Sequence, residues 1–303
     1  MSDGVLIGPE VPKHVEHRIR TRDGRTLAVA EWGDPAGLAL FSLHGTPGGR
    51  ISYWHDPAIY ARHGLRRFTF DRPGYGESTR LKGRRVADIV ADVIAIADAL
   101  GLDRLAVTGG SGGGPHALAC AALLPDRVVR CLADVSVAPF DAPGLDWMAG
   151  MTQGNVEEFE AALAGEEQIR EIADRERTTL LARIAEGRAD FLGDGYAMSE
   201  SDQEQMARHF WQFANHLQSC LNTGVDGWVD DDLAFVAPWG FDVASIDLPT
   251  LVKYGRDDTL VPPSHGDWLT SHIRGARVVI EDAGHMGDDA TYDEELAWLA
   301  GER

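Results

Sequence analysis

Cysteine is scarce in this sequence. Only Cys120, Cys131 and Cys220 occur among 303 residues. So few thiols, and an odd number of them, exclude a small fold held together by several disulfides. Cys120 and Cys131 lie in apolar stretches, which predicts small buried side chains rather than reactive ones.

Long apolar runs are also lacking. No stretch reaches the ~20 apolar residues that a membrane-spanning helix needs. The first residues, Met1 to Gly4, have neither the basic nor the apolar segment of a secretory signal. We therefore expect a cytoplasmic protein with no membrane partner.

Positively charged residues are also few. The chain has 28 Lys and Arg against 48 Asp and Glu, a net charge of −20. Such a chain repels phosphate backbones and anionic lipids, and its best basic run, residues 82–85, is short. We expect no nucleic-acid partner. The remaining composition, 44% hydrophobic and 25% charged, is ordinary for a globular protein and excludes wholesale disorder.

Strand and helix patterns alternate through most of the chain. Apolar runs bounded by turn residues predict strands, and apolar residues at helical spacing predict helices. The expected strands are residues 18–20, 26–32, 38–43, 67–70, 105–108, 128–137, 250–254 and 277–280. The expected helices of this part are residues 86–100, 115–124, 265–273 and 292–300, the last of which follows the final strand. This order predicts an α/β fold with a mostly parallel sheet flanked by helices.

Residues 138–245 differ from this pattern, because they carry helix signals and almost no strand signal. The expected helices are residues 156–164, 167–185 and 202–221. A capping-box pattern at Ser201 marks the start of the third. We therefore predict an α/β core in two parts, residues 1–137 and 246–303, interrupted by a helical insertion at 138–245.

The glycine cluster Gly109–Gly113 matches the pattern G-x-S-x-G around Ser111. It follows a predicted strand and precedes a predicted helix, the context in which this motif raises a nucleophilic serine out of a sheet. The alternative is a phosphate-binding loop. That loop requires a following Gly-Lys-Ser/Thr, where Pro115 and His116 stand instead.

A nucleophilic serine needs a base, and the base needs an orienting acid. His285 follows the last predicted strand, and Asp257 and Asp258 follow the strand before it. Loops after parallel strands meet at the edge of the sheet where Ser111 is expected. His265 and His272 lie on a predicted helix and are less suited to act as the base.

The loop His44–Gly49 follows the third predicted strand. In this architecture that loop supplies one N–H group for an oxyanion, and the residue after the nucleophile supplies the other. We assign these groups to Thr46 and Gly112. His44 is a conceivable base, but a histidine that holds the loop by hydrogen bonds is the favoured interpretation.

Together these motifs resemble the α/β-hydrolase superfamily, in the branch with a helical cap between the sixth and seventh strands. The matching segments are residues 44–49, 71–78, 109–113, 255–262 and 284–285. The resemblance implies a triad of Ser111, Asp258 and His285. It selects Asp258 because the family spacing Gly-x-x-Asp-x-x-x-Pro fits Gly255, Asp258 and Pro262, whereas Asp257 is out by one.

Within that superfamily, Ser111 argues against dehalogenases and epoxide hydrolases, whose nucleophile is an aspartate. We expect a serine hydrolase that cleaves a small carboxylic ester or lactone through an acyl-enzyme, without a cofactor or metal. A proline iminopeptidase-like aminopeptidase and a C–C bond hydrolase are alternatives on the same triad. Loop 44–49 looks like that of iminopeptidases, but Gly112 and residues 71–74 depart from their pattern. A non-catalytic ligand-binding homologue is the third alternative.

The insertion is expected to determine substrate specificity. Tyr53, Trp54 and Trp211 are candidates for substrate binding, while most aromatic residues of the insertion are expected in its own core. The run Asp230–Asp232 is expected to be a helix N-cap rather than a metal site. Glutamates such as Glu157, Glu158 and Glu160 could bind a substrate amine, but a solvated helix face is the favoured interpretation. A homodimer is left open.

Overall fold

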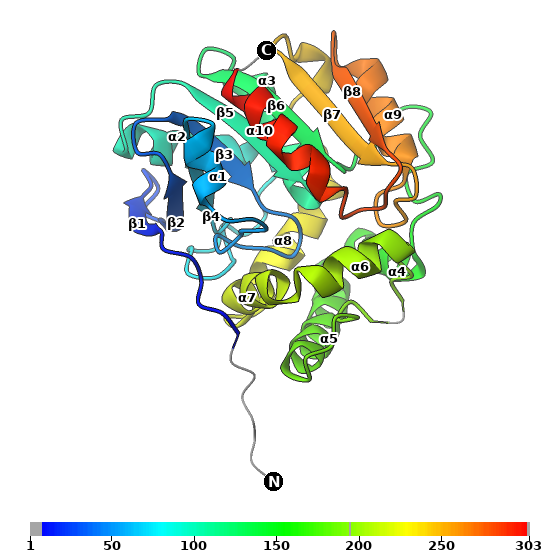
Figure 1. Cartoon of the computed structure of the whole chain (residues 1–303). Coiled ribbons are helices and arrows are strands. Elements are labelled where there is room, and N and C mark those ends of the chain that lie inside the picture. The colour runs from blue at the N-terminus through cyan, green and yellow to red at the C-terminus, as the bar shows by residue number, and fades with distance from the viewer. Residues whose placement is uncertain (1–7, 194, 302–303) are drawn as a thin grey trace.

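An eight-stranded sheet forms the centre of the computed structural model, which describes residues 8–193 and 195–301 (Figure 1). The strand order is β1-β2-β4-β3-β5-β6-β7-β8, in which β2 is antiparallel to β1 and β4 and all other neighbours are parallel. The strands are β1 (Val15–Arg20), β2 (Thr26–Gly33), β3 (Leu38–Leu43), β4 (Leu65–Phe70), β5 (Leu105–Gly110), β6 (Val128–Asp134), β7 (Thr250–Gly255) and β8 (Arg277–Glu281). The predicted fold class is confirmed.

The inner strands of the sheet are buried on both faces, as parallel strands require, whereas the edge strands β1 and β8 are largely exposed. Two consecutive residues of β3 show this: Phe41 belongs to the apolar core on one face, and Leu40 belongs to the core on the other. The helices of the α/β core are α1 (Ala58–Arg62), α2 (Ile89–Ala99), α3 (Gly114–Leu123), α9 (Pro263–His272) and α10 (Tyr292–Ala300). The three cysteines are free and buried, as predicted for Cys120 and Cys131.

Among the described residues, five α-helices lie between β6 and β7 in the chain, and they gather beside one end of the sheet (Figure 1). They are α4 (Gln153–Ala164), α5 (Glu166–Ala185), α6 (Glu200–Arg208), α7 (Phe210–Leu221) and α8 (Asp226–Phe235), and we call them the inserted helices. They have an apolar core of their own, with Ile169, Leu180 and Trp228 among its buried residues. The sequence Gly193-Asp194-Gly195 predicts a loop in the insertion, and Asp194 lies outside the described residues.

The structure corrects three details of the insertion. The single helix expected at 202–221 is two helices that meet at His209. The cap of α6 is Ser199, whose hydroxyl accepts the Asp202 N–H at 3.1 Å, rather than Ser201. Helix α8 was not expected at all, because its run of acidic residues looked like a cap rather than the buried middle of a helix.

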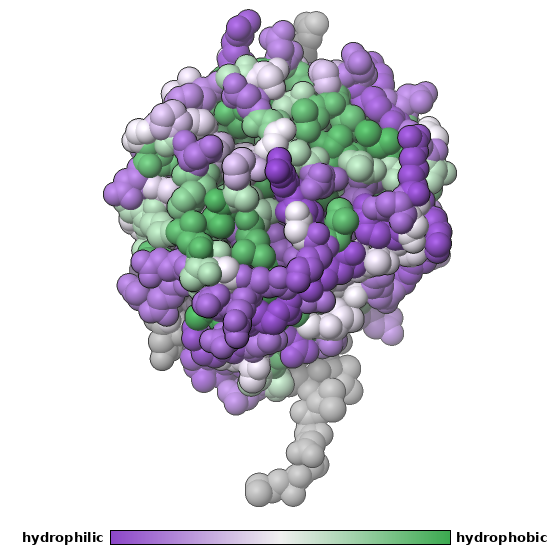
Figure 2. All heavy atoms as spheres, turned by 180° about the vertical axis from the view of Figure 1, so that it is seen from behind, coloured by the Kyte–Doolittle hydropathy of each residue, from purple (hydrophilic) through white to green (hydrophobic). Residues whose placement is uncertain are grey.

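The surface seen from behind is mostly hydrophilic, with apolar areas that form separate patches (Figure 2). Among the described residues, no helix is long and apolar enough to cross a membrane. The cytoplasmic location stays a prediction from the sequence.

Candidate active site

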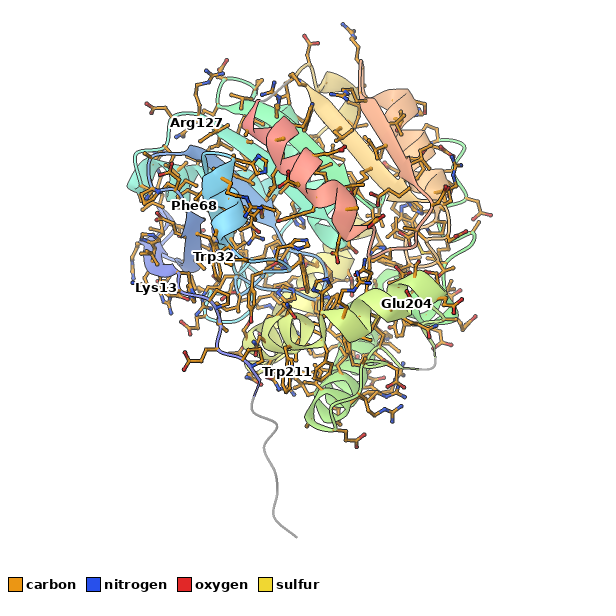
Figure 3. All side chains as sticks on the ribbon, viewed as in Figure 1. Lys13, Trp32, Phe68, Arg127, Glu204 and Trp211 are labelled. Atoms are coloured by element: carbon orange, nitrogen blue, oxygen red, sulfur yellow. The ribbon has the colours of Figure 1, made fainter. Side chains whose placement is uncertain are left out.

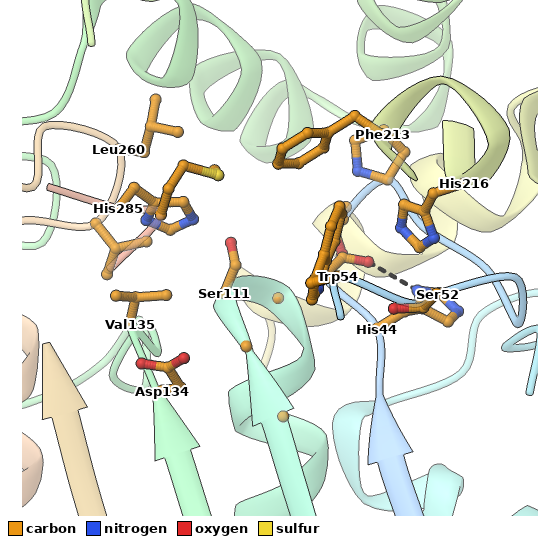
Figure 4. Close-up of a pocket in the computed structure, with 18 of the residues that line it drawn as sticks. His44, Ser52, Trp54, Ser111, Asp134, Val135, Phe213, His216, Leu260 and His285 are labelled. Carbon is orange, nitrogen blue, oxygen red and sulfur yellow. Dashed lines mark hydrogen bonds between the residues drawn. The ribbon is translucent and has the colours of Figure 1, made fainter. Parts of the chain in front are cut away.

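Ser111 stands at the turn between β5 and α3. Its φ angle is +53°, in the left-handed region that residues with a side chain seldom adopt. The turn is tight: a Cβ on Gly109 would lie 2.1 Å from the Gly113 carbonyl oxygen, and a Cβ on Gly113 would lie 2.1 Å from that of Leu43. Glycine is therefore required on both sides of the serine. In the close-up, the Ser111 side chain points into the cavity between His285 and Trp54 (Figure 4).

His285 and Asp258 form the second part of the site. The His285 Nδ1 lies 2.8 Å from Asp258 Oδ2, and both side chains are buried. The other carboxylate oxygen of Asp258 accepts the backbone N–H groups of Leu260 and Val261, each at 2.8 Å. The carboxylate therefore has a fixed orientation and accepts Nδ1–H, which leaves Nε2 as the basic nitrogen of a neutral ring. Asp257 is exposed.

The electrostatics of His285 favour a basic imidazole. Burial lowers the pKa of His285, but the adjacent Asp258 carboxylate outweighs burial, with help from Asp202 and Asp134. The net result is a pKa above the ordinary value for histidine. A base of this kind accepts a proton readily near neutral pH.

Thr46 and Gly112 lie side by side at the cavity wall. A Cβ on Gly112 would lie 2.3 Å from Thr46 Oγ1. His44 holds the same loop: its Nδ1 lies 2.8 Å from the Gly45 carbonyl oxygen, and its Nε2 accepts the Arg72 N–H at 3.1 Å. Burial, together with nearby Arg72, holds the pKa of His44 well below its usual range. A neutral histidine with both nitrogens occupied matches the loop-holding role.

The cavity beside Ser111 has a volume of about 380 Å³, within the usual range for a small-molecule site. Apolar side chains of the inserted helices, of the segment between α5 and α6 and of the loop after β7 form much of its wall: Phe159, Leu180, Phe191, Phe213, Leu217, Phe235 and Leu260. The sequence did not single these residues out as cavity residues. Phe213 and Leu217 are four residues apart on α7, and this spacing marked the helix but not which face meets the cavity.

Of the three predicted substrate-binding residues, only Trp54 lines the cavity. Tyr53 is buried in the apolar core, and its hydroxyl accepts a hydrogen bond from Asn215 Nδ2 at 2.8 Å. Trp211 lies on the side of α7 away from the sheet (Figure 3), where Gly8 packs against its ring. Tyr53 and Trp211 are not among the residues that line the cavity, so their part in substrate binding stays a prediction from the sequence.

Seven acidic residues also line the cavity, and three of them, Glu158, Glu176 and Asp232, belong to the inserted helices. Glu158 is buried and accepts Trp228 Nε1 at 2.5 Å and the Tyr196 hydroxyl at 3.2 Å, so the expected solvated face is wrong for this residue. Burial raises the pKa of Asp232 well above its usual range, and neighbouring Glu158 raises it further. Burial likewise raises the pKa of Glu158.

The run Asp230–Asp232 lies inside α8, so the expected N-cap is wrong. Asp230 pairs with Arg80, and Asp231 pairs with Arg72 and Arg84. Within residues 8–193 and 195–301, no group of three or more His, Cys, Asp or Glu is arranged to hold a metal ion.

Comparisons with known proteins agree with this architecture. The family model for the alpha/beta hydrolase fold matches residues 39–287, so the chain belongs to this family and is one of its hydrolases. A non-heme chloroperoxidase of Streptomyces lividans is 27% identical over 254 residues, 80% of this chain and 83% of that protein. A proline iminopeptidase of Xanthomonas citri is 37% identical over 121 residues, which are 38% of this chain and 37% of the iminopeptidase.

Solved structures share the fold over nearly the whole chain. The enol-lactonase of Burkholderia xenovorans LB400 superposes with a TM-score of 0.66 at 20% identity, covering 93% of this chain and 96% of the lactonase. An esterase of Thermogutta terrifontis has a TM-score of 0.63 at 21% identity, covering 95% and 96%.

Proposed function

We propose that the protein is a serine hydrolase that cleaves a small carboxylic ester or lactone by a Ser111–His285–Asp258 triad. The observation that carries this proposal is the juxtaposition of three parts in one cavity. Ser111 stands on a left-handed turn, His285 is held by Asp258 at 2.8 Å, and Thr46 adjoins Gly112.

The chemistry follows from these positions. The Ser111 hydroxyl attacks the ester carbonyl while His285 Nε2 accepts its proton, and the Thr46 and Gly112 N–H groups stabilise the oxyanion. The proton on His285 then passes to the departing alkoxide, which leaves an acyl-enzyme. A water molecule, deprotonated by His285, attacks the acyl carbon; the bond to Ser111 Oγ then breaks, His285 returns the proton to Ser111, and the acid is released. The inserted helices act as a cap over this cavity and set the size of the substrate.

A second candidate, an aminopeptidase-like activity on substrates with a positively charged amine, is favoured by the acidic wall of the cavity. Asp232 Oδ2 is buried and receives no hydrogen bond from a nitrogen or hydroxyl donor, and the carboxyl group of Glu158 lies beside it, close enough for the two acids to share a proton. An ammonium group bound here would replace that shared proton and allow both carboxylates to ionise. The partial similarity to a proline iminopeptidase points in the same direction.

Two p-nitrophenyl esters of nearly equal shape separate the candidates. The propionyl ester is neutral, and the glycyl ester replaces its terminal methyl group with an ammonium. Hydrolysis of the propionyl ester with a similar or higher kcat/KM supports the first candidate. A strong preference for the glycyl ester, together with cleavage of prolyl p-nitroanilide, supports the second. Hydrolysis of neither ester nor anilide contradicts both and leaves the non-catalytic alternative.

A matched set of variants tests the acidic wall itself. Under the second candidate, Glu158→Gln and Asp232→Asn lower kcat/KM for the glycyl ester by about tenfold or more and spare the propionyl ester. Glu160→Gln on the exposed face of α4 is the control and leaves both unchanged. An equal loss of kcat/KM on both esters would show that the two carboxylates stabilise the folded protein and do not bind the ammonium group.

A further inference from the structure

A buried aspartate of the inserted helices is tied directly to the loop that carries Thr46. Asp231 lies in the middle of α8 and is fully buried. It does not line the cavity, so it has no place in the triad mechanism. One of its oxygens, Oδ2, accepts the Thr46 hydroxyl at 2.8 Å and the Tyr75 hydroxyl at 2.8 Å.

The same carboxylate holds Arg72, a fully buried cation from the loop after β4. Arg72 donates to both oxygens of Asp231, through its Nε at 3.2 Å and its Nη2 at 2.5 Å. Arg84 approaches Asp231 Oδ1 at 2.6 Å. Because two guanidinium groups face it, the pKa of Asp231 lies well below its usual range although burial alone would raise it. A single carboxylate therefore fixes the position of Arg72.

Arg72 in turn donates hydrogen bonds to three successive residues of the loop. It donates to the carbonyl oxygen of His44, to that of Gly45 at 2.9 Å and to Thr46 Oγ1 at 3.0 Å. In a trans peptide the carbonyl and the following N–H point in opposite directions within one plane. With the Gly45 carbonyl held toward Arg72, the Thr46 N–H is aimed away from Arg72.

We infer that Asp231 is a positioning residue for the oxyanion hole, acting through Arg72 and the Thr46 hydroxyl. This inference rests on the proposed serine hydrolase function. It also links substrate binding to catalysis, because α8 brings Asp232 and Phe235 to the cavity wall on the same helix that anchors the loop. The inserted helices therefore complete the catalytic centre as well as covering it.

The rate at which a fluorophosphonate modifies Ser111 is the test, because this reaction also builds negative charge on an oxygen in the hole. Asp231→Asn keeps the shape of the side chain and removes its charge. Thr46→Val keeps the backbone N–H and removes the hydroxyl. We expect each to slow labelling by about 10- to 100-fold, as for a misplaced oxyanion donor. For the preferred ester, kcat should fall while KM stays nearly constant.

Asp230→Asn is the matched control. Asp230 is also buried in α8 and pairs with Arg80, at 2.8 Å and 2.9 Å, but it has no contact with the loop. This variant should lose thermal stability and label Ser111 at the wild-type rate. The double variant Asp231→Asn/Thr46→Val should be no slower than its slower parent, since both changes break one chain of contacts.

The labelling rates distinguish a failure of the proposed function from a failure of the inference about Asp231. If wild type is not labelled at Ser111, the proposed function fails. If wild type is labelled but Asp231→Asn reacts as fast, or no more slowly than Asp230→Asn, the inference about Asp231 is overturned and the function stands. If Asp231→Asn does not fold, Thr46→Val decides, and a wild-type labelling rate in that variant overturns the inference.

Discussion

Asp258 and His285 are 27 residues apart in the chain, and the Oδ2 of the first lies 2.8 Å from the Nδ1 of the second. The neighbour Asp257 is exposed. This difference between adjacent aspartates arises because the loop after β7 turns Asp258 inward, where two backbone N–H groups fix its other oxygen. The acid partner of the histidine is thus defined by geometry as well as by motif spacing.

Exchange of each aspartate for asparagine tests this assignment. Asp258→Asn should reduce kcat by up to about 10⁴-fold, because an amide favours the wrong tautomer of His285. Asp257→Asn should change kcat by less than about tenfold, since an exposed side chain contributes little. Steady-state kinetics of both variants on one ester decide the question. The reverse order of losses would transfer the role to Asp257.

The pH dependence of the reaction reports on His285. The imidazole must be neutral to act as a base, so kcat/KM should rise with pH through the pKa of His285 and then level off. Because the Asp258 carboxylate outweighs the effect of burial, that midpoint should lie above the ordinary value of about 6.5. A pH profile from 5 to 9 measures it. A flat profile would identify another group as the base.

Substitution of Gly112 should damage the oxyanion hole without touching the triad. In Gly112→Ala the new methyl carbon would lie 2.3 Å from Thr46 Oγ1 and must displace the loop. We expect kcat to fall by about 100-fold, comparable to the loss of one oxyanion donor. Gly110→Ala is the comparison, because nothing lies within 4 Å of its added methyl carbon. Equal losses in the two variants would refute a specific role for the Gly112–Thr46 contact.

Asp232 should make the protein less stable as the pH rises. Burial, with Glu158 nearby, raises the folded-state pKa of Asp232 well above that of the unfolded chain, so between these values the folded state binds more protons. Stability then falls with increasing pH. Asp232→Asn should remove this dependence and raise Tm more at pH 8 than at pH 5. Thermal unfolding of both proteins at the two pH values tests this, and equal shifts would contradict it.

Most of the α/β core was predictable because its inner strands are short apolar runs that end at a turn. The run Leu38–Leu43 is β3 without a change of boundary, and Tyr292–Ala300 is α10. The site motifs were predictable for the same reason, since Ser111, Asp258 and His285 each follow a strand of the parallel sheet. Loops after such strands meet at one edge whatever the rest of the chain does.

The inserted helices were less predictable because their polar residues are buried. Asp231 looks like a surface residue in sequence, yet Arg72 and Arg84 compensate its charge from positions about 150 residues away. Glu158 is turned inward by bonds to Trp228 and Tyr196. Such long-range partners leave no periodic signal in the local sequence.

Loss of the Ser111 hydroxyl tests the account most directly. Mass spectrometry of the protein treated with a fluorophosphonate should find the modified peptide at Ser111 and nowhere else. In Ser111→Ala, labelling should vanish and kcat should fall by about 10⁴- to 10⁶-fold, with circular dichroism and Tm showing a folded protein. A folded Ser111→Ala variant that keeps a tenth of the wild-type rate would contradict the assignment of Ser111 as the nucleophile.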